Sequence, residues 1–165
     1  MPETAPSDFE AILKILVRHG VDFIVVGGVA AVLEGAPVNT FDLNIVHARD
    51  AANVQMLLAA LTSLDAVYRT RREPRLKPAP SHLSSPGHQR LMTRFGPLDV
   101  LGRIGSARGY DELLAHTIEV ELSEELRVRI LDLETVIAVK EEVGGEKDAA
   151  TLPILRRTLE EKRRV

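Results

Sequence analysis

Asp42 and Asp99 are acidic residues inside segments that are otherwise mostly apolar and typical of strands. Asn44 is expected on the same strand face as Asp42 because side chains alternate faces along a strand. Asp99 would reach that face from a neighbouring strand. Acids gathered on a sheet supply the hard oxygen ligands that hold Mg²⁺ against a triphosphate. Because Asp is disfavoured in strands, the two acids favour a site for divalent-metal phosphoryl or nucleotidyl transfer.

Both acids also have ordinary explanations. Asp42 would then be a surface carboxylate on an edge strand, and Asp99 a hairpin residue that pairs with a nearby arginine. The apolar residues around each acid weigh against these explanations. The neighbours of Asp42 that are expected to point into a core are Phe41, Leu43 and Ile45.

The pair Gly27-Gly28 follows an apolar segment, 21–26, and precedes a short helical segment. Glycines at such a turn let backbone amides approach a phosphate at the positive end of a helix. The P-loop and GxGxxG patterns are absent, so on spacing alone the glycines fit a plain turn equally well. Thr40 would add a hydroxyl near the phosphates, with a plain turn residue as its alternative.

Apolar periodicity and turn residues predict an α/β (α+β) fold, with a short mixed sheet, helices packed on it and C-terminal helices across a cleft. We expect one domain over 1–165, with a core of about 8–131 and a helical part of about 132–165. Helices are predicted from Ser7 or Asp8 to near Gly20 and over 29–34, 50–61, 110–116, 133–143 and 147–162. Strands are predicted over 21–26, 42–46, 89–95, 98–101, 118–122 and 126–130.

Composition restricts the classes of function. The chain has 165 residues, 45% of them hydrophobic, with a net charge of -3, which argues against nucleic-acid binding by bulk charge. It has no cysteine, which excludes disulfides and thiolate metal sites and suits a reducing compartment. The start lacks the pattern of a secretory signal, and the longest apolar run is too short to span a bilayer. We therefore expect a cytoplasmic location and no membrane contact.

Several charged residues have both a functional and a plain interpretation. Arginines, a lysine and prolines over 68–87 predict a basic loop that would grip a nucleic acid or a triphosphate, or simply be solvated. Lys140 and Lys147 are expected on helices, where solvation is again the alternative. The five histidines lack the HExxH spacing of a zinc site, and His47 is expected to be a plain strand-end residue.

Taken in order, the motifs resemble the nucleotidyltransferase superfamily, specifically small bacterial proteins grouped with minimal nucleotidyltransferase antitoxins and abortive-infection toxins. The residues that carry this resemblance are 25–31, 40–46, 95–101, Lys140 and Lys147-Asp148. The resemblance implies that Gly27 and Gly28 hold a triphosphate, that Asp42 is a shared metal ligand and that Asp99 is the third acid, which helps to activate a hydroxyl. It also implies that Lys140 or Lys147 faces the nucleotide.

Asn44 departs from that family pattern, which has a second aspartate at this position. An amide oxygen can bind Mg²⁺ but brings no charge, so a second ion would bind weakly or not at all, and slow turnover, reliance on Mn²⁺ or no turnover is expected. The leading hypothesis is transfer of NMP from an NTP to a hydroxyl on a protein, RNA or small molecule. The alternative is an inactive protein of the same fold that binds a nucleotide or a partner protein, as in a toxin-antitoxin pair. The sequence leaves open whether the chain binds a partner protein or forms a homodimer.

Overall fold

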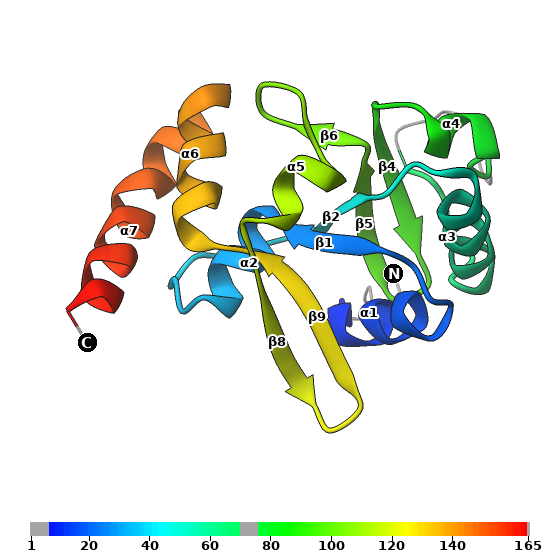
Figure 1. Cartoon of the computed structure of the whole chain (residues 1–165), viewed down its shortest axis with the longest axis horizontal. Coiled ribbons are helices and arrows are strands. Elements are labelled where there is room, and N and C mark those ends of the chain that lie inside the picture. Colours follow the sequence, from blue (N-terminus) through cyan, green and yellow to red (C-terminus); the bar gives the residue numbers. More distant parts are fainter. Residues whose placement is uncertain (1–6, 70–75, 165) are drawn as a thin grey trace, which may run out of the picture.

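One mixed sheet organises the molecule (Figure 1). The structure is a computed structural model that describes residues 7–69 and 76–164, without the side chains of 146–148. Within these residues, seven strands lie in the order β3-β4-β5-β2-β1-β9-β8. The β2–β5 and β1–β9 pairs are parallel and the other pairs are antiparallel. The strands are β1 (Phe23–Val26), β2 (Leu43–His47), β3 (Val67–Tyr68), β4 (His88–Thr93), β5 (Gly96–Leu101), β8 (Thr117–Ser123) and β9 (Leu126–Leu131), with β6 (Arg103–Ile104) and β7 (Arg108–Gly109) forming a separate ribbon.

Helices cover the sheet and extend the C-terminal end of the chain. They are α1 (Phe9–Arg18), α2 (Gly27–Leu33), α3 (Ala51–Ser63), α4 (Pro80–Ser84), α5 (Tyr110–Leu114), α6 (Leu133–Val143) and α7 (Glu146–Arg163). An aspartate caps three of them, since the side chains of Asp8, Asp50 and Asp132 accept hydrogen bonds from backbone amides in the first turns of α1, α3 and α6. Such caps satisfy amides that have no partner inside the helix.

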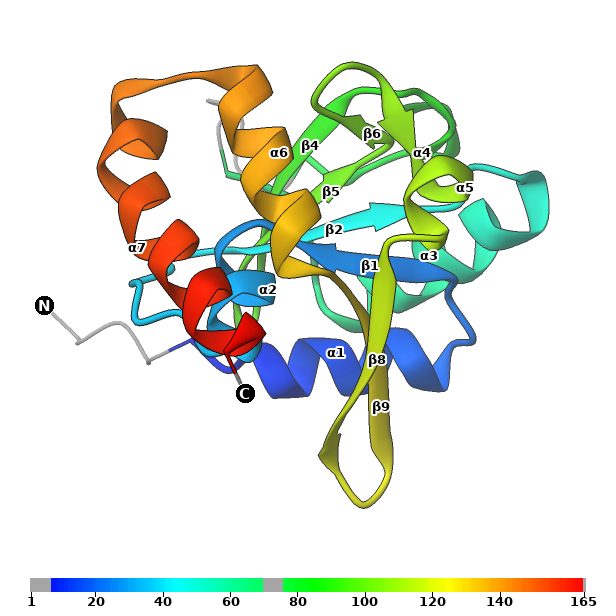
Figure 2. The same cartoon turned by 60° about the vertical axis from the view of Figure 1, so that its left-hand side comes forward.

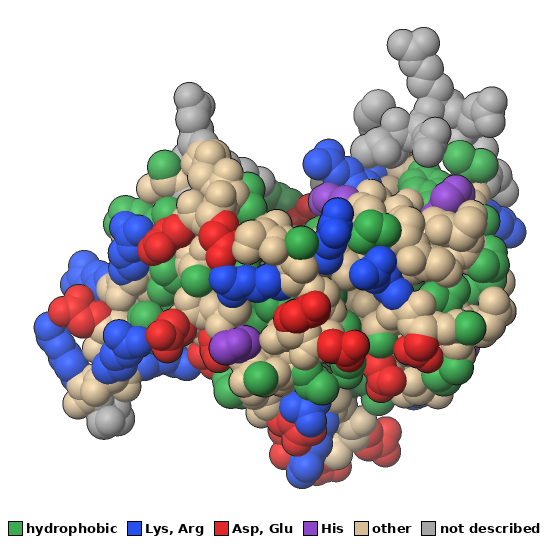
Figure 3. Space-filling view, turned by 45° about the horizontal axis from the view of Figure 1, so that its top comes forward, with side chains coloured by type: hydrophobic (Ala, Val, Ile, Leu, Met, Phe, Trp, Pro, Cys, Tyr) green, Lys and Arg blue, Asp and Glu red, His purple; other side chains and the backbone are tan. Residues whose placement is uncertain are grey.

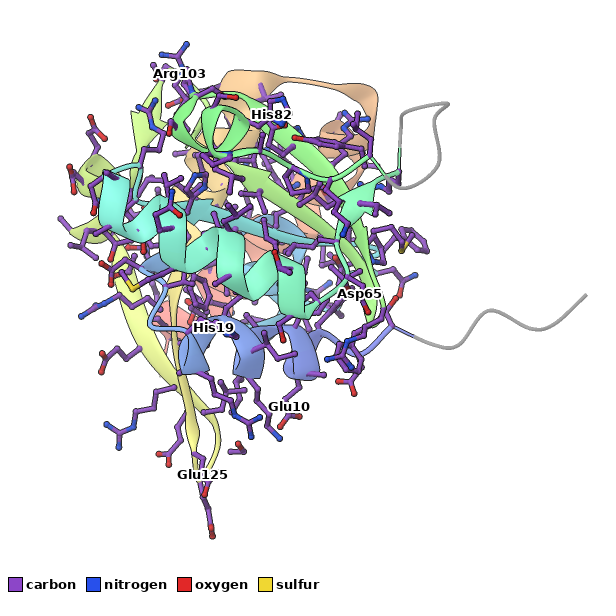
Figure 4. All side chains as sticks on the ribbon, turned by 90° about the vertical axis from the view of Figure 1, so that its right-hand side faces the viewer. Glu10, His19, Asp65, His82, Arg103 and Glu125 are labelled. Atoms are coloured by element: carbon purple, nitrogen blue, oxygen red, sulfur yellow. The ribbon has the colours of Figure 1, made fainter. Side chains whose placement is uncertain are left out.

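The core lies between the sheet and the helices α1 and α3, which Figure 4 shows side by side in front of the strands. Leu43, Ile45, Leu98 and Val100 are fully buried there because their strands present alternate side chains to this face. The hairpin of β8 and β9 extends away from the body (Figure 2), with Glu125 at its tip (Figure 4). Within the described residues, no helix combines the length and the apolar character needed to span a membrane.

The predicted fold class is confirmed, and so are the predicted hairpins and the placement of β5 beside β2. One predicted core residue is wrong. The side chain of Phe41 is not in the core, and the residue is 74% exposed, because β2 begins only at Leu43 and residues 41 and 42 form a bend before it. The alternation of side chains between the two faces of the sheet holds within β2, for Leu43 and Ile45, and does not extend to residues that precede the strand.

Candidate active site

The pairing of strands places the candidate site residues in one row across the sheet. Val26 of β1 lies opposite Asn44 of β2, Asn44 lies opposite Asp99 of β5, and Asp99 lies opposite Arg90 of β4. Directly opposed residues share a face, so this row lies on the face away from Leu43 and Ile45. The parallel pairing of β2 with β5 therefore brings Asn44 and Asp99 side by side.

Arg69 connects the two acids. Its Nη2 atom lies 2.6 Å from Oδ1 of Asp99 and 3.5 Å from Oδ2 of Asp42. The second oxygen of Asp99, Oδ2, lies 2.9 Å from Nε2 of His88. Arg69 is held in this position by a hydrogen bond from Nη1 to the carbonyl of Leu91, at 2.8 Å. Because both acids contact one nitrogen atom, their oxygens converge on one small space.

The environment of Asp99 favours its charged form. The side chain is only 6% exposed, and burial by itself would raise its pKa. The hydrogen bonds and positive charges of His88 and Arg69 outweigh burial and lower the pKa of Asp99 below its ordinary value. Asp99 is therefore a buried carboxylate that stays ionised and is a weak base.

The two glycines are required by the packing of the turn against β2. Gly27 has φ +67°, and a Cβ atom there would lie 2.7 Å from Nδ2 of Asn44. A Cβ atom on Gly28 would lie 3.0 Å from Oγ1 of Thr40. These distances are too short for an ordinary contact at Gly27 and tight at Gly28. The glycines thus bring the start of α2 against Asn44 and Thr40, whether or not a phosphate also binds there.

Two cavities adjoin each other at the start of α2. Both are lined by Gly27, Asn44 and Lys140. The first, which we call the polar cavity, measures about 170 Å³ and is also lined by Gly28, Ala31, Val38, Asn39, Thr40, Phe41, Asp42, Thr151 and Leu155. The second, which we call the apolar cavity, measures about 190 Å³ and is also lined by Val26, His88, Asp99, Leu101, Ile104, Leu131, Val136, Val139 and Val143. In Figure 3 the surface is hollowed between the C-terminal helices and the rest of the molecule.

The oxygens at this site fit one divalent cation better than two. Asp42 and Asp99 converge, and Oδ1 of Asn44 is buried without a hydrogen-bond partner in the part of the chain that the structure describes. A buried oxygen of that kind is costly unless a ligand or ion binds it. Two carboxylates and one amide oxygen form a hard donor set, but they carry one charge less than three acids would. Among the described residues, no three His, Cys, Asp or Glu side chains are grouped in a way that could hold a metal ion.

The other predicted residues are found in different places. Thr40 lines the polar cavity and donates a hydrogen bond from Oγ1 to the carbonyl of Asp42, at 3.0 Å. The side chain of Lys147 and the loop arginines Arg71, Arg72 and Arg75 lie outside the described residues. His47 is buried on the opposite face, where Nε2 donates to the carbonyl of Leu83 at 2.7 Å, so its structural interpretation is confirmed.

Sequence reasoning missed Arg69, the contact of His88 with Asp99, and the exposure of Phe41. Arg69 was grouped with the basic loop, although it directly follows β3, and its amide donates to the carbonyl of Arg90. His88 was considered only as a zinc ligand. The register of the β4–β5 hairpin was the available signal, since it places the start of β4 near Asp99.

Comparisons with known proteins identify the fold. No protein-family model matches the sequence, and no curated protein sequence matches it significantly. Chains of solved structures do match, and two of them are the following. One is a Thermotoga maritima protein described as a "putative nucleotidyltransferase", with 19% identity over 93% of this chain and 91% of that chain and a TM-score of 0.57. The other is a lincosamide antibiotic adenylyltransferase bound to lincomycin, with 14% identity over 92% of this chain and 98% of that chain and a TM-score of 0.61.

Proposed function

We propose, starting from the nucleotidyltransferase fold of this chain, that it transfers a nucleoside monophosphate from a nucleoside triphosphate to a hydroxyl group, with pyrophosphate leaving. The oxygen of the hydroxyl would bond to the α-phosphorus as the bond from that phosphorus to the pyrophosphate oxygen breaks. The observation that carries this proposal is the convergence of Asp42 and Asp99, with Asn44 between the cavities, on one space beside the glycine turn. A fold alone does not define an activity, whereas such a site supports one.

The polar cavity suits the triphosphate. It combines the glycine turn, the Thr40 hydroxyl and Lys140, which are groups that donate hydrogen bonds or carry positive charge. Asp42, Asp99 and Oδ1 of Asn44 would hold one Mg²⁺ or Mn²⁺ ion at its edge. A bound divalent cation would neutralise phosphate charge as the leaving group departs.

The residues of this chain also predict slow chemistry. An aspartate at position 44 would contribute about 4 kcal/mol per unit of cation charge at ~4 Å and an intermediate dielectric, and Asn44 does not. Arg69 occupies the space between the acids, so an ion has to displace it or bind beside it. Asp99 is a weak base, so the hydroxyl proton would pass to it late, after the new bond to phosphorus has formed.

The acceptor is one of three kinds: a protein, an RNA or a small molecule. The second solved structure is named as an adenylyltransferase of an antibiotic, and this brings a small-molecule hydroxyl into consideration here. The described residues add no aromatic cluster for stacking the bases of an RNA, because aromatic residues form only 4% of the chain.

Thermal shift with the four NTPs, each with EDTA, Mg²⁺ or Mn²⁺, is the first test. A ligand that binds only the folded state raises the apparent stability once its concentration exceeds its dissociation constant. We expect stabilisation by an NTP that depends on the metal, followed by transfer of label from an α-³²P NTP. Absence of any NTP effect under all three conditions would refute the proposal.

A second candidate function is nucleotide binding without transfer. The observation that favours it is that Arg69 contacts both acids, at a site that already lacks one charge at Asn44. Stabilisation by NTP without transfer of label, in wild type and in the Asn44→Asp variant alike, would support this candidate. A role in a toxin-antitoxin pair stays a prediction.

A further inference from the structure

The apolar cavity is built differently from the polar one that we assign to the triphosphate. Seven hydrocarbon side chains, from β1, β5, β6, β9 and α6, form most of its wall: Val26, Leu101, Ile104, Leu131, Val136, Val139 and Val143. The side chains with polar groups are Asn44, His88, Asp99 and Lys140. Asn44 and Lys140 are also part of the polar cavity, so they mark the side where the two cavities meet, and Asp99 lies next to Asn44 across the β2–β5 pair.

We infer that the apolar cavity binds the acceptor, and that the acceptor is a hydroxyl carried on a compact apolar body such as an aromatic ring. This inference rests on the proposed function. A hydroxyl at the polar side would lie beside Asp99 and face the α-phosphate across Asn44. The apolar body would lie against the hydrocarbon wall, where its removal from water provides the driving force.

The size of the cavity agrees with such a ligand. An apolar protein cavity of about 150 Å³ is known to accommodate benzene, so about 190 Å³ holds one substituted ring. One tyrosine side chain of a peptide also fits such a volume. The shared chemistry is therefore a phenol or a related alcohol, either free or as a tyrosine side chain.

The nucleobase of the NTP is the main competitor for this cavity. A base carries several donors and acceptors around its ring, and most of them would lie unpaired against hydrocarbon here. The cavity thus matches one hydroxyl and an apolar remainder better than it matches a nucleotide.

Methyl NMR of the full chain, titrated with p-cresol, tests the inference directly. We expect p-cresol to shift the methyl signals of Leu101 and Val143, and glycerol to leave them unchanged. Val139→Phe fills the cavity and should weaken p-cresol at least tenfold while changing the dissociation constant of Mn²⁺-ATP less than twofold. Ile154→Phe is the matched control, since Ile154 is an exposed residue on α7 outside both cavities.

Further arms separate the possible failures. Val143→Phe, at the exposed end of α6, replaces Val139→Phe if that variant does not fold. If Val139→Phe and Val143→Phe bind p-cresol as tightly as wild type does, the inference is overturned. Displacement of p-cresol by adenosine would overturn it as well. Competition by N-acetyl-tyrosine amide would show that the phenol can belong to a peptide, and its absence would favour a free small molecule. Failure of ATP to bind, with p-cresol binding intact, would count against the proposed function and not against the cavity.

Discussion

Replacing Arg69 with alanine tests how the site balances its charge. Asp99 is 6% exposed and Arg69 is 23% exposed, so their contact at 2.6 Å is largely shielded from water. Removing one partner of a buried ion pair costs about 3–5 kcal/mol because the other charge is left buried. His88 still contacts the second oxygen of Asp99, so we expect a loss near the low end, about 3 kcal/mol. For a chain of this size that lowers Tm by ~6–12 °C.

A divalent cation should reverse this loss. Without the guanidinium, Asp42, Asp99 and Oδ1 of Asn44 face a space that an ion can enter. An ion at 100 times its dissociation constant stabilises the folded state by about 2.7 kcal/mol, which is close to the loss. Arg69→Ala should therefore gain more stability from Mn²⁺ than wild type, in which the ion competes with Arg69.

The assay is chemical denaturation and thermal unfolding in EDTA and in a Mn²⁺ series. Arg127→Ala is the control, because Arg127 contacts Glu121 at 3.9 Å on the exposed hairpin and such pairs contribute little. Arg69→Lys, which keeps the charge, should lose less than Arg69→Ala. The reasoning fails if Arg69→Ala is as stable as wild type in EDTA, or if Mn²⁺ stabilises it no more than it stabilises Arg127→Ala.

Three other changes have defined outcomes. Asn44→Asp should be less stable than wild type in EDTA, because it adds a carboxylate beside Asp99. The same variant should bind Mn²⁺ at least tenfold more tightly and transfer label faster than wild type. Transfer of label that is no faster than in wild type would contradict this expectation. Gly27→Ala should lower the free energy of unfolding by more than the ~1–2 kcal/mol that left-handed backbone strain costs, because its Cβ atom also meets Asn44. Gly35→Ala is the control, since Gly35 has φ +101° and open space around it, and chemical denaturation of this variant should show the backbone strain alone. Burial lowers the pKa of His47 below 6.5, so the unfolded chain binds its proton first and the free energy of unfolding should fall as pH drops below about 6.5. His47→Gln should flatten this part of the pH profile, and an unchanged slope would contradict the reasoning.

Much of the fold is predictable from local patterns. The aspartate caps before α1 and α3, the glycine turn after β1 and the two hairpins depend on residues close together in sequence. The pairing of β2 with β5 also followed, since a hairpin carrying Asp99 was expected to lie beside the strand that carries Asn44.

Other features depend on where side chains reach across strands, and sequence does not contain that information directly. Arg69 follows a two-residue strand at the edge of the order β3-β4-β5-β2, yet its guanidinium extends past β4 to Asp99. Its length makes this reach possible, but only the pairing of β3 with β4 selects the direction. Phe41 was misplaced because the apolar alternation gives no sign that the strand begins two residues later.

Asn44 and Arg69 link the metal dependence that we propose to the stability of the folded chain. With an amide at position 44, the convergent acids Asp42 and Asp99 carry two negative charges, and Arg69 contacts both of them while His88 contacts the second oxygen of Asp99. A third acid would add negative charge that one guanidinium does not neutralise, and a bound cation would then stabilise the folded state more than it stabilises wild type. The amide at position 44 therefore reduces the repulsion among these side chains, and under the proposed function it also removes charge that would hold a second ion.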